Sequence, residues 1–198
     1  IVGYTLISLP ANGTLYADSS LSIPVKAGDA LASATLYFVP DADWNGSASF
    51  AYTATDSGGA VSNSATASLS VSPINDAPVA ADVAAAGDED AASIAITLSA
   101  SDLDGSILGY TLTSLPANGT LYADSGLGIS VKAGDALASA TLYFVPDADW
   151  HGATSFGYTA IDNEGASSST ATASITVDAV NDLPLISGDD SGGVTEDD

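Results

Sequence analysis

The sequence predicts an all-β protein made of tandem two-sheet sandwich domains, and three observations support this prediction. Residues 25–44 read VKAGDALASATLYFVPDADW, and residues 131–150 repeat them letter for letter. Between such segments, short runs of alternating apolar residues are bounded by turn residues, which is typical of strands. No stretch shows the sustained 3.6-residue period of a helix. Six or seven strands in about 105 residues favour a sandwich.

The repeat has a period of 106 residues, which is the difference between Tyr4 and Tyr110. Domains usually contain about 100–150 residues, so one period corresponds to one domain. Ile1 aligns with Ile107, which lies well inside the second repeat. We therefore predict an incomplete first repeat over residues 1–76 that lacks its opening strands, a complete repeat over 77–182, and a linker with the start of a third unit over 183–198.

Alternation within the complete repeat predicts strands at residues 93–100, 108–115, 120–123, 140–145, 155–161 and 170–177. The dipeptide Asn118-Gly119, like Asn12-Gly13, predicts a tight turn because both residue types tolerate a positive φ. Large aromatic side chains are expected to supply much of the core, namely Tyr110, Trp150, Phe156 and Tyr158.

The charge balance is strongly acidic, with 25 acidic residues, two basic ones and a formal net charge of −23. Such a surface repels phosphate backbones and anionic lipid, so we expect no nucleic acid partner and no membrane insertion. No apolar run approaches the ~20 residues of a membrane helix, and the Ile-Val-Gly-Tyr start resembles no signal peptide. We expect this piece to be internal to, or processed from, a longer protein. Cysteine is absent, which leaves bound metal as the obvious device to cross-link a secreted β protein.

The acidic residues are concentrated, since 14 of the 25 lie in residues 76–104 and 178–198. Each window starts with Asn-Asp and a nearby proline, at Asn75-Asp76 and Asn181-Asp182. Ca²⁺ prefers six to eight oxygen ligands, and clustered carboxylates without Lys or Arg repel one another unless a cation lies between them. The recurrence predicts Ca²⁺ at both domain junctions, whereas any single pair could equally be a solvated acidic turn. An EF-hand is excluded at Asp102, because that loop would need Glu where Thr113 stands.

Several motifs resemble the cadherin-like repeats of large bacterial RTX-type adhesins, which function in cell adhesion and biofilms. These motifs are Tyr-Thr-Ala-x-Asp, Val-x-x-x-Asn-Asp-x-Pro, Asp-Glu-Asp, Ala-Ser-Asp-x-Asp-Gly and Pro-Asp-Ala-Asp-Trp-x-Gly, and the tail over residues 186–198 is similar to the opening of a VCBS repeat. The resemblance implies tandem Ig-like, cadherin-like Greek-key sandwiches arranged as a rod, with Ca²⁺ between successive domains.

By analogy with cadherins, the resemblance also implies the ligands. The first junction would use Asp43, Asn75, Asp76, Asp102, Asp104 and Asp162, with Asp41 as an optional addition, and the second Glu89, Asp149, Asn181 and Asp182. Asp88 is a further candidate ligand. The linker motif is shorter than in cadherins and Asp-Ala-Asp-Trp replaces Leu-Asp-Arg-Glu, which leaves the number of ions open. The implied protein is a secreted or cell-surface extender module that Ca²⁺ rigidifies and whose partners are its neighbouring repeats.

Catalysis is not expected from this sequence. The only histidine, His151, is replaced by Asn45 in the first repeat, so we interpret it as a turn residue. Without cysteine, no Cys/His or repeated Ser/His machinery can form. A glycosidase-like pair of Asp147 and Asp149 is conceivable, but it recurs on the same turn of the first repeat. Besides the extender module, the sequence is compatible with a carbohydrate- or receptor-binding module and with a fibre subunit assembled with other copies by strand addition.

Overall fold

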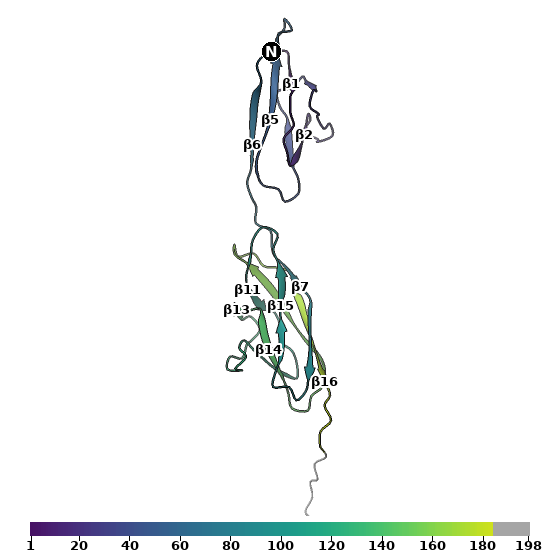
Figure 1. The fold of residues 1–198 in the computed structure, drawn as a ribbon, viewed down its shortest axis with the longest axis vertical. Coiled ribbons are helices and arrows are strands. Elements are labelled where there is room, and N and C mark those ends of the chain that lie inside the picture. Colours follow the sequence, from purple (N-terminus) through teal and green to yellow (C-terminus); the bar gives the residue numbers. More distant parts are fainter. Residues whose placement is uncertain (184–198) are drawn as a thin grey trace, which may run out of the picture. The chain divides into compact units, whose positions relative to one another are not determined.

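The computed structural model describes residues 1–183 and divides the chain into two compact units, Ile1–Ile74 and a second unit that begins at Asn75. All regular elements within residues 1–183 are strands, which confirms the predicted all-β sandwich class (Figure 1). Asn75 and Asp76, which the repeat alignment assigns to the end of the first repeat, belong to the second unit. The third unit predicted at 183–198 lies, apart from Leu183, outside the described residues.

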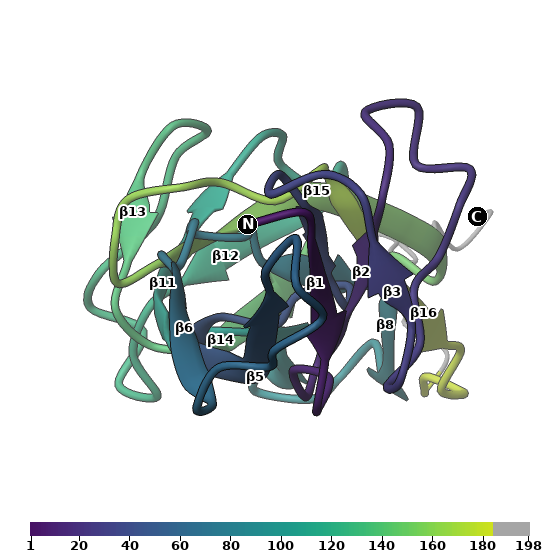
Figure 2. The same cartoon turned by 90° about the horizontal axis from the view of Figure 1, so that it is seen from above.

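The first unit contains six strands in two sheets. They are β1 (Gly3–Leu6), β2 (Gly13–Tyr16), β3 (Ala30–Leu31), β4 (Tyr37–Pro40), β5 (Gly46–Thr55) and β6 (Ala65–Val71). One sheet has the order β3-β1-β5-β6, and β2 pairs with β4 in the other. Figure 2 shows β1, β5 and β6 of the larger sheet next to one another.

Within residues 75–183, the second unit contains ten strands. They are β7 (Val79–Ala81), β8 (Val83–Asp88), β9 (Ile94–Thr97), β10 (Ser99–Ser101), β11 (Ile107–Leu112), β12 (Gly119–Tyr122), β13 (Ala136–Leu137), β14 (Thr141–Pro146), β15 (Gly152–Asp162) and β16 (Ala171–Asp178). One sheet has the order β13-β11-β15-β16-β8, the other contains β12-β14-β9, and β10 pairs with β7. Only Asp82 separates β7, which pairs with β10, from β8, which belongs to the five-stranded sheet.

The two units share a common framework. Strands β1 to β6 correspond to β11 to β16 at a shift of 106 residues, whereas β7 to β10 have no counterpart within residues 1–74. In the second unit, β8 extends one sheet by parallel pairing with β16, and β9 extends the other by antiparallel pairing with β14. The opening segment, which contains β7 to β10, therefore contributes an edge strand to each sheet of the complete sandwich.

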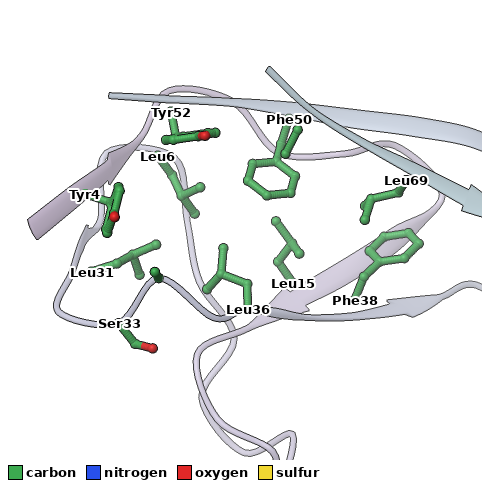
Figure 3. A pocket seen from close by; sticks show the side chains of 12 residues that line it. Tyr4, Leu6, Leu15, Leu31, Ser33, Leu36, Phe38, Phe50, Tyr52 and Leu69 are labelled. Carbon is green, nitrogen blue, oxygen red and sulfur yellow. The ribbon is translucent and has the colours of Figure 1, made fainter. Parts of the chain in front are cut away.

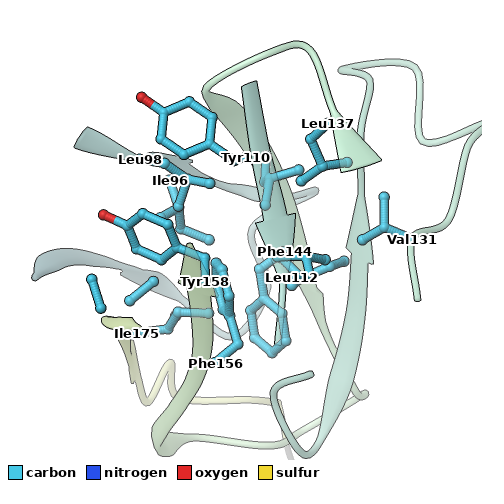
Figure 4. Close-up of a cluster of buried hydrophobic side chains, with 14 of the residues drawn as sticks. Ile96, Leu98, Tyr110, Leu112, Val131, Leu137, Phe144, Phe156, Tyr158 and Ile175 are labelled. Carbon is cyan, nitrogen blue, oxygen red and sulfur yellow. The ribbon is translucent and has the colours of Figure 1, made fainter. Parts of the chain in front are cut away.

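The core of the second unit lies between its two sheets (Figure 4). The predicted core positions are confirmed: Tyr158, Phe156 and Tyr110 are buried, and the half-buried Trp150 packs against them. From the opening segment, Ile94, Ile96 and Leu98 all point inward because alternate residues of a strand face the same side.

In each Asn-Gly turn, the asparagine and the glycine are favoured for different structural reasons. Asn118 has a φ of 58°, as the turn prediction expects, but Gly119 is the first residue of β12 and does not have a positive φ. A Cβ on Gly119 would lie 2.5 Å from the carbonyl oxygen of Val145 on the neighbouring strand. Glycine is required there by the close approach of the backbone and not by its conformational freedom.

Candidate functional site

The predicted metal ligands of the second unit form two groups. The Asn75 group consists of Asn75, Asp76, Asp102, Asp104 and Asp162. The Glu89 group consists of the predicted ligands Glu89, Asp149 and Asp182, together with Asp90 and His151, which the sequence analysis did not identify as ligands. Within each group, hydrogen bonds or charge interactions connect residues that lie far apart in the sequence.

Asp162 anchors the Asn75 group from the end of β15, where its side chain is fully buried. The side-chain amide of Asn75 donates a 2.8 Å hydrogen bond to Asp162 Oδ2. The amides of Glu164 and Ala166 donate to Asp162 Oδ1 at 2.9 and 2.8 Å, which shapes the turn after β15. These donors, and above all Asn75, hold the pKa of Asp162 below its usual 3.8, while burial opposes them. The carboxylate is therefore stabilised in its charged form.

The linker residue Asp76 is also hydrogen-bonded to the turn that follows β10. The amide of Asp76 donates to both carboxylate oxygens of Asp104 at 3.2 Å, and the amide of Asp104 donates to Asp102 Oδ1 at 3.3 Å. A Cβ on Gly105 would lie 2.9 Å from Asp102 Oδ2, so glycine leaves room for this carboxylate. The Asp-x-Asp-Gly motif and the Asn-Asp linker are thus brought together by the fold.

Two oxygens of the Asn75 group are buried without a donor. Asn75 Oδ1 and Asp102 Oδ2 receive no hydrogen bond from any part of the chain that the structure describes. Buried acceptors without a partner are rare, because each loses its interaction with water. A solvated acidic turn would leave such oxygens exposed. A carboxylate and an amide oxygen are also the donor types that Ca²⁺ prefers, so these residues fit a hard cation.

Glu89 is the centre of the second group, and its side chain is only 5% exposed. Its Oε1 accepts a 2.8 Å hydrogen bond from the amide of Val180, and its Oε2 lies 3.3 Å from His151 Nδ1. The negative charge of Asp90 raises the pKa of Asp182, and burial and the charges of Asp149 and Glu89 add to this effect. The side chain of Asp182 therefore lies within reach of three other negative charges.

The interpretation of His151 as a turn residue was incomplete. We interpreted it as a turn residue, and it does follow the turn at Trp150, but its ring also contacts Glu89. The histidine and glutamate are 62 residues apart, and Asn45 stands at the position equivalent to His151 in the first unit. No local pattern in the sequence links the two residues.

The remaining predicted ligands have less distinctive surroundings. Asp88 ends β8 opposite Asp178 of β16, and the side chain of Asn181 donates to the backbone carbonyl of Asp182 at 3.1 Å. Asp41 and Asp43 lie in a turn of the first unit, where Asp43 has a φ of 58°. Their participation in the same site as Asn75 stays a prediction. Within residues 1–183, no three Asp, Glu or His side chains form a ready-made metal cluster.

The lowered pKa of Asp162 predicts a specific acid sensitivity. A carboxylate whose folded-state pKa lies below 3.8 adds stability above that pH, and this stability is lost as the pH falls through the lower folded value. Asp162→Asn should therefore lower the melting temperature of the second unit at pH 5–7, and the difference from wild type should shrink below pH 3.8. Thermal melts in calcium-free buffer from pH 2 to 7 measure this effect.

The matched control for this experiment is Asp56→Asn in the first unit. Asp56 occupies the equivalent turn and accepts hydrogen bonds from the amides of Gly58 and Ala60, both at 2.9 Å, but it is exposed. This variant should leave the pH dependence of the second unit unchanged. Parallel melting curves for Asp162→Asn and wild type down to pH 2 would contradict the role of the buried carboxylate.

The arrangement defines a class of protein: an Ig-like sandwich module with two groups of acidic side chains. The chain belongs to the bacterial Ig domain family, whose sequence profile matches residues 75–177. Domains of this family are typically structural or adhesive extracellular modules, and they are typically not enzymes. Residues 1–183 contain no helix with the length and hydropathy needed to span a membrane.

Comparison with curated proteins gives no match. Among solved structures, the fibronectin(III)-like modules of Clostridium thermocellum CbhA are similar over 92% of this chain and 85% of theirs, with 18% identity and a TM-score of 0.33. Drosophila N-cadherin EC1-4 is similar over 89% of this chain and 41% of its own, with 16% identity and a TM-score of 0.37.

Proposed function

We propose that the chain is an extender segment of a secreted or cell-surface adhesin, without catalytic activity, and that it takes up Ca²⁺ through its Asn75 and Glu89 groups. The observation that carries the proposal is the pair of buried, unpartnered oxygens on Asn75 and Asp102. A bound cation would supply positive charge to these oxygens. The raised pKa of Asp182 is a second sign, because it reflects the nearby negative charges of Asp90, Asp149 and Glu89.

Each group lies next to a segment that leaves the second unit. The backbone of Asp76 is bonded to Asp104, and the backbone of Val180 is bonded to Glu89. Residues that hold a cation at these points also fix the direction in which the chain enters and leaves the sandwich. We therefore propose that calcium stiffens the connections to neighbouring domains, in an adhesin of the type that the sequence motifs resemble.

Calcium should stabilise the second unit measurably. Extracellular calcium modules have dissociation constants of about 10⁻⁴–10⁻³ M. At 10 mM Ca²⁺, such a site adds about 1.4–2.7 kcal/mol to the free energy of unfolding, because only the folded state binds. Titration calorimetry should detect Ca²⁺ uptake, and the melting temperature should fall when EDTA is added. Small-angle scattering should also show a change in maximum dimension upon chelation.

Substitutions test whether the Asn75 group is the site that binds calcium. Asp102→Asn keeps the size of the side chain but removes the charge on the unpartnered oxygen, so it should weaken calcium binding at least about tenfold. Asp56→Asn removes the same charge from an exposed turn of the first unit and should leave the affinity unchanged. If calorimetry finds no uptake and the melting temperature is the same in EDTA, the calcium proposal is wrong, although the membership in the bacterial Ig domain family is unaffected.

A further inference from the structure

Two tyrosines lie side by side on the outer face of the three-stranded sheet of the second unit. Tyr122 of β12 lies directly opposite Tyr143 of β14. Directly opposite residues of neighbouring strands project from the same face, with Cβ atoms about 4.5–5.5 Å apart. Their chain neighbours Leu121, Leu142 and Phe144 are buried in the core, whereas both tyrosines are only half-buried. Because successive residues of a strand point to opposite faces, the two rings lie on the outside of the sandwich.

The neighbouring positions of this face carry short side chains. Ala95 of β9 lies opposite Tyr143 on its other side, and its methyl group covers little of the ring. Thr97 and Thr141 also lie opposite each other, with their Oγ1 atoms 3.4 Å apart. The face therefore combines two aromatic rings with nearby hydroxyl groups.

The outward aromatic pair is specific to the smaller sheet. The other two tyrosines of the second unit, Tyr110 and Tyr158, lie in the core, where their rings pack edge to face. On the larger sheet, the outward positions in the middle of β15 and β16 carry only small side chains, namely Ser155, Gly157, Thr159, Thr172, Ser174 and Thr176. The packing of the sandwich therefore does not require aromatic residues on an outer face.

The first unit carries the same pair. Tyr16 of β2 lies directly opposite Tyr37 of β4. Their neighbours Leu15 and Phe38 point into the space between the two sheets (Figure 3). The two tyrosines consequently project from the other side of their strands. Each repeat presents the aromatic pair once.

Charge restricts the class of ligand that fits this face. Strands β9, β12 and β14 contain no charged residue, although the whole chain has a formal net charge of −23. Anionic ligands are repelled by such a chain, and cationic ligands are attracted to the acidic groups and not to this face. A neutral ligand with flat apolar surfaces and many hydroxyl groups matches the rings and the threonines. Sugar rings have this chemistry, since their C–H groups pack on an aromatic face while their hydroxyls bind polar groups.

We propose that the outer face of the β12-β14-β9 sheet, and its counterpart on β2 and β4, binds a neutral glycan chain. Sugar rings stack on Tyr122 and Tyr143, and the hydroxyls of Thr97 and Thr141 bind sugar hydroxyls. Neighbouring strands lie about 4.8 Å apart, which is close to the length of one hexose ring. Successive rings of a chain that crosses the strands therefore reach the tyrosines of successive strands. This site is separate from the Asn75 and Glu89 groups and does not depend on the calcium proposal.

The test titrates the full chain in EDTA with cellohexaose, laminarihexaose and mannohexaose, and measures binding by calorimetry. At least one of these neutral glycans should bind. Replacing all four outward tyrosines by alanine should weaken that binding at least about tenfold, whereas replacing them by phenylalanine keeps the rings and should change it less than about threefold. The matched control is Thr159→Ala with Thr176→Ala, on the outer face of the larger sheet, which should leave the affinity unchanged.

A second measurement uses the unmodified chain, so that it does not depend on the folding of a variant. In NMR spectra, the ring protons of Tyr122 and Tyr143 should shift when the glycan is added, and those of the buried Tyr110 and Tyr158 should not. Three outcomes would overturn the proposal: no binding of any of the three glycans at 10 mM, shifts that spare Tyr122 and Tyr143, or equal affinity for the anionic hexagalacturonate.

Discussion

Phe144→Ala should destabilise the second unit by about 3–5 kcal/mol, which is the usual cost of removing a buried aromatic side chain. Phe144 is 0% exposed and lies on β14, where it contacts the opening strand β9 and the residues of the opposite sheet. A domain is typically stable by only about 5–15 kcal/mol, so the loss is a large fraction of the total. Denaturant unfolding measures it, with Trp150 as reporter in a Trp44→Phe background.

Two further variants make this result specific. Phe144→Leu fills part of the space and should cost clearly less than Phe144→Ala, because the remaining cavity is smaller. Phe38→Ala makes the same change at the half-buried counterpart in the first unit and should shift the second unit's transition by less than about 0.5 kcal/mol. A loss below about 1 kcal/mol for Phe144→Ala would mean that the opening segment does not close a tight core.

The sequence predicts strands well where large apolar residues alternate. Ile94, Ile96 and Leu98 mark the inward face of β9, and the 106-residue repeat relates the strands β11 to β16 to the strands β1 to β6 of the first unit. Strand β8 was not predicted, because Val83–Asp88 is mostly alanine and glycine and has little β propensity of its own. It becomes a strand through parallel pairing with β16, which is an interaction between distant segments that local patterns do not encode.

The two acidic groups were likewise predictable from the sequence only in part. The recurrence of Asn-Asp and Asp-x-Asp identifies which residues are candidates, and the structure brings Asn75 to Asp162 over a separation of 87 residues. The sequence does not show which of their side-chain oxygens lack a hydrogen-bond donor. In Asp102 one oxygen accepts the amide of Asp104 and the other has no donor, and this depends on the exact course of the turn. A sequence pattern gives residue types, but the coordination chemistry depends on individual atoms.

The second large effect concerns Asp182→Asn, which should act in opposite directions without and with calcium. A carboxylate whose pKa is raised above 3.8 in the folded state destabilises that state once the pH exceeds the folded value, because its charge meets those of Asp90, Asp149 and Glu89. Removing the charge should therefore raise the melting temperature of the second unit at pH 7 in EDTA. The gain should disappear below pH 3.8, where the wild-type carboxyl group binds its proton.

With calcium present, the same substitution should be harmful. A divalent cation would relieve the repulsion that Asp90, Asp149 and Glu89 exert on Asp182, and the affinity of a calcium site rises with the number of charged ligands. Asp182→Asn should therefore weaken calcium binding at the Glu89 group at least about tenfold, as measured by calorimetry. Its melting temperature in 10 mM Ca²⁺ should then fall below that of the wild type.

Asp182→Asn should melt above the wild type in EDTA and below it in calcium, and this reversal distinguishes a cation site from an ordinary acidic surface. If the Glu89 group were only a solvated turn, Asp182→Asn would stabilise the chain equally with and without calcium, and 0.5 M NaCl would reduce both gains through screening. Asp56→Asn also removes one negative charge, and the order of its melting temperature and that of the wild type should not reverse when calcium is added. A variant of Asp182 that is less stable than wild type in EDTA would contradict the repulsion itself, since the carboxylate would then be held by a favourable contact.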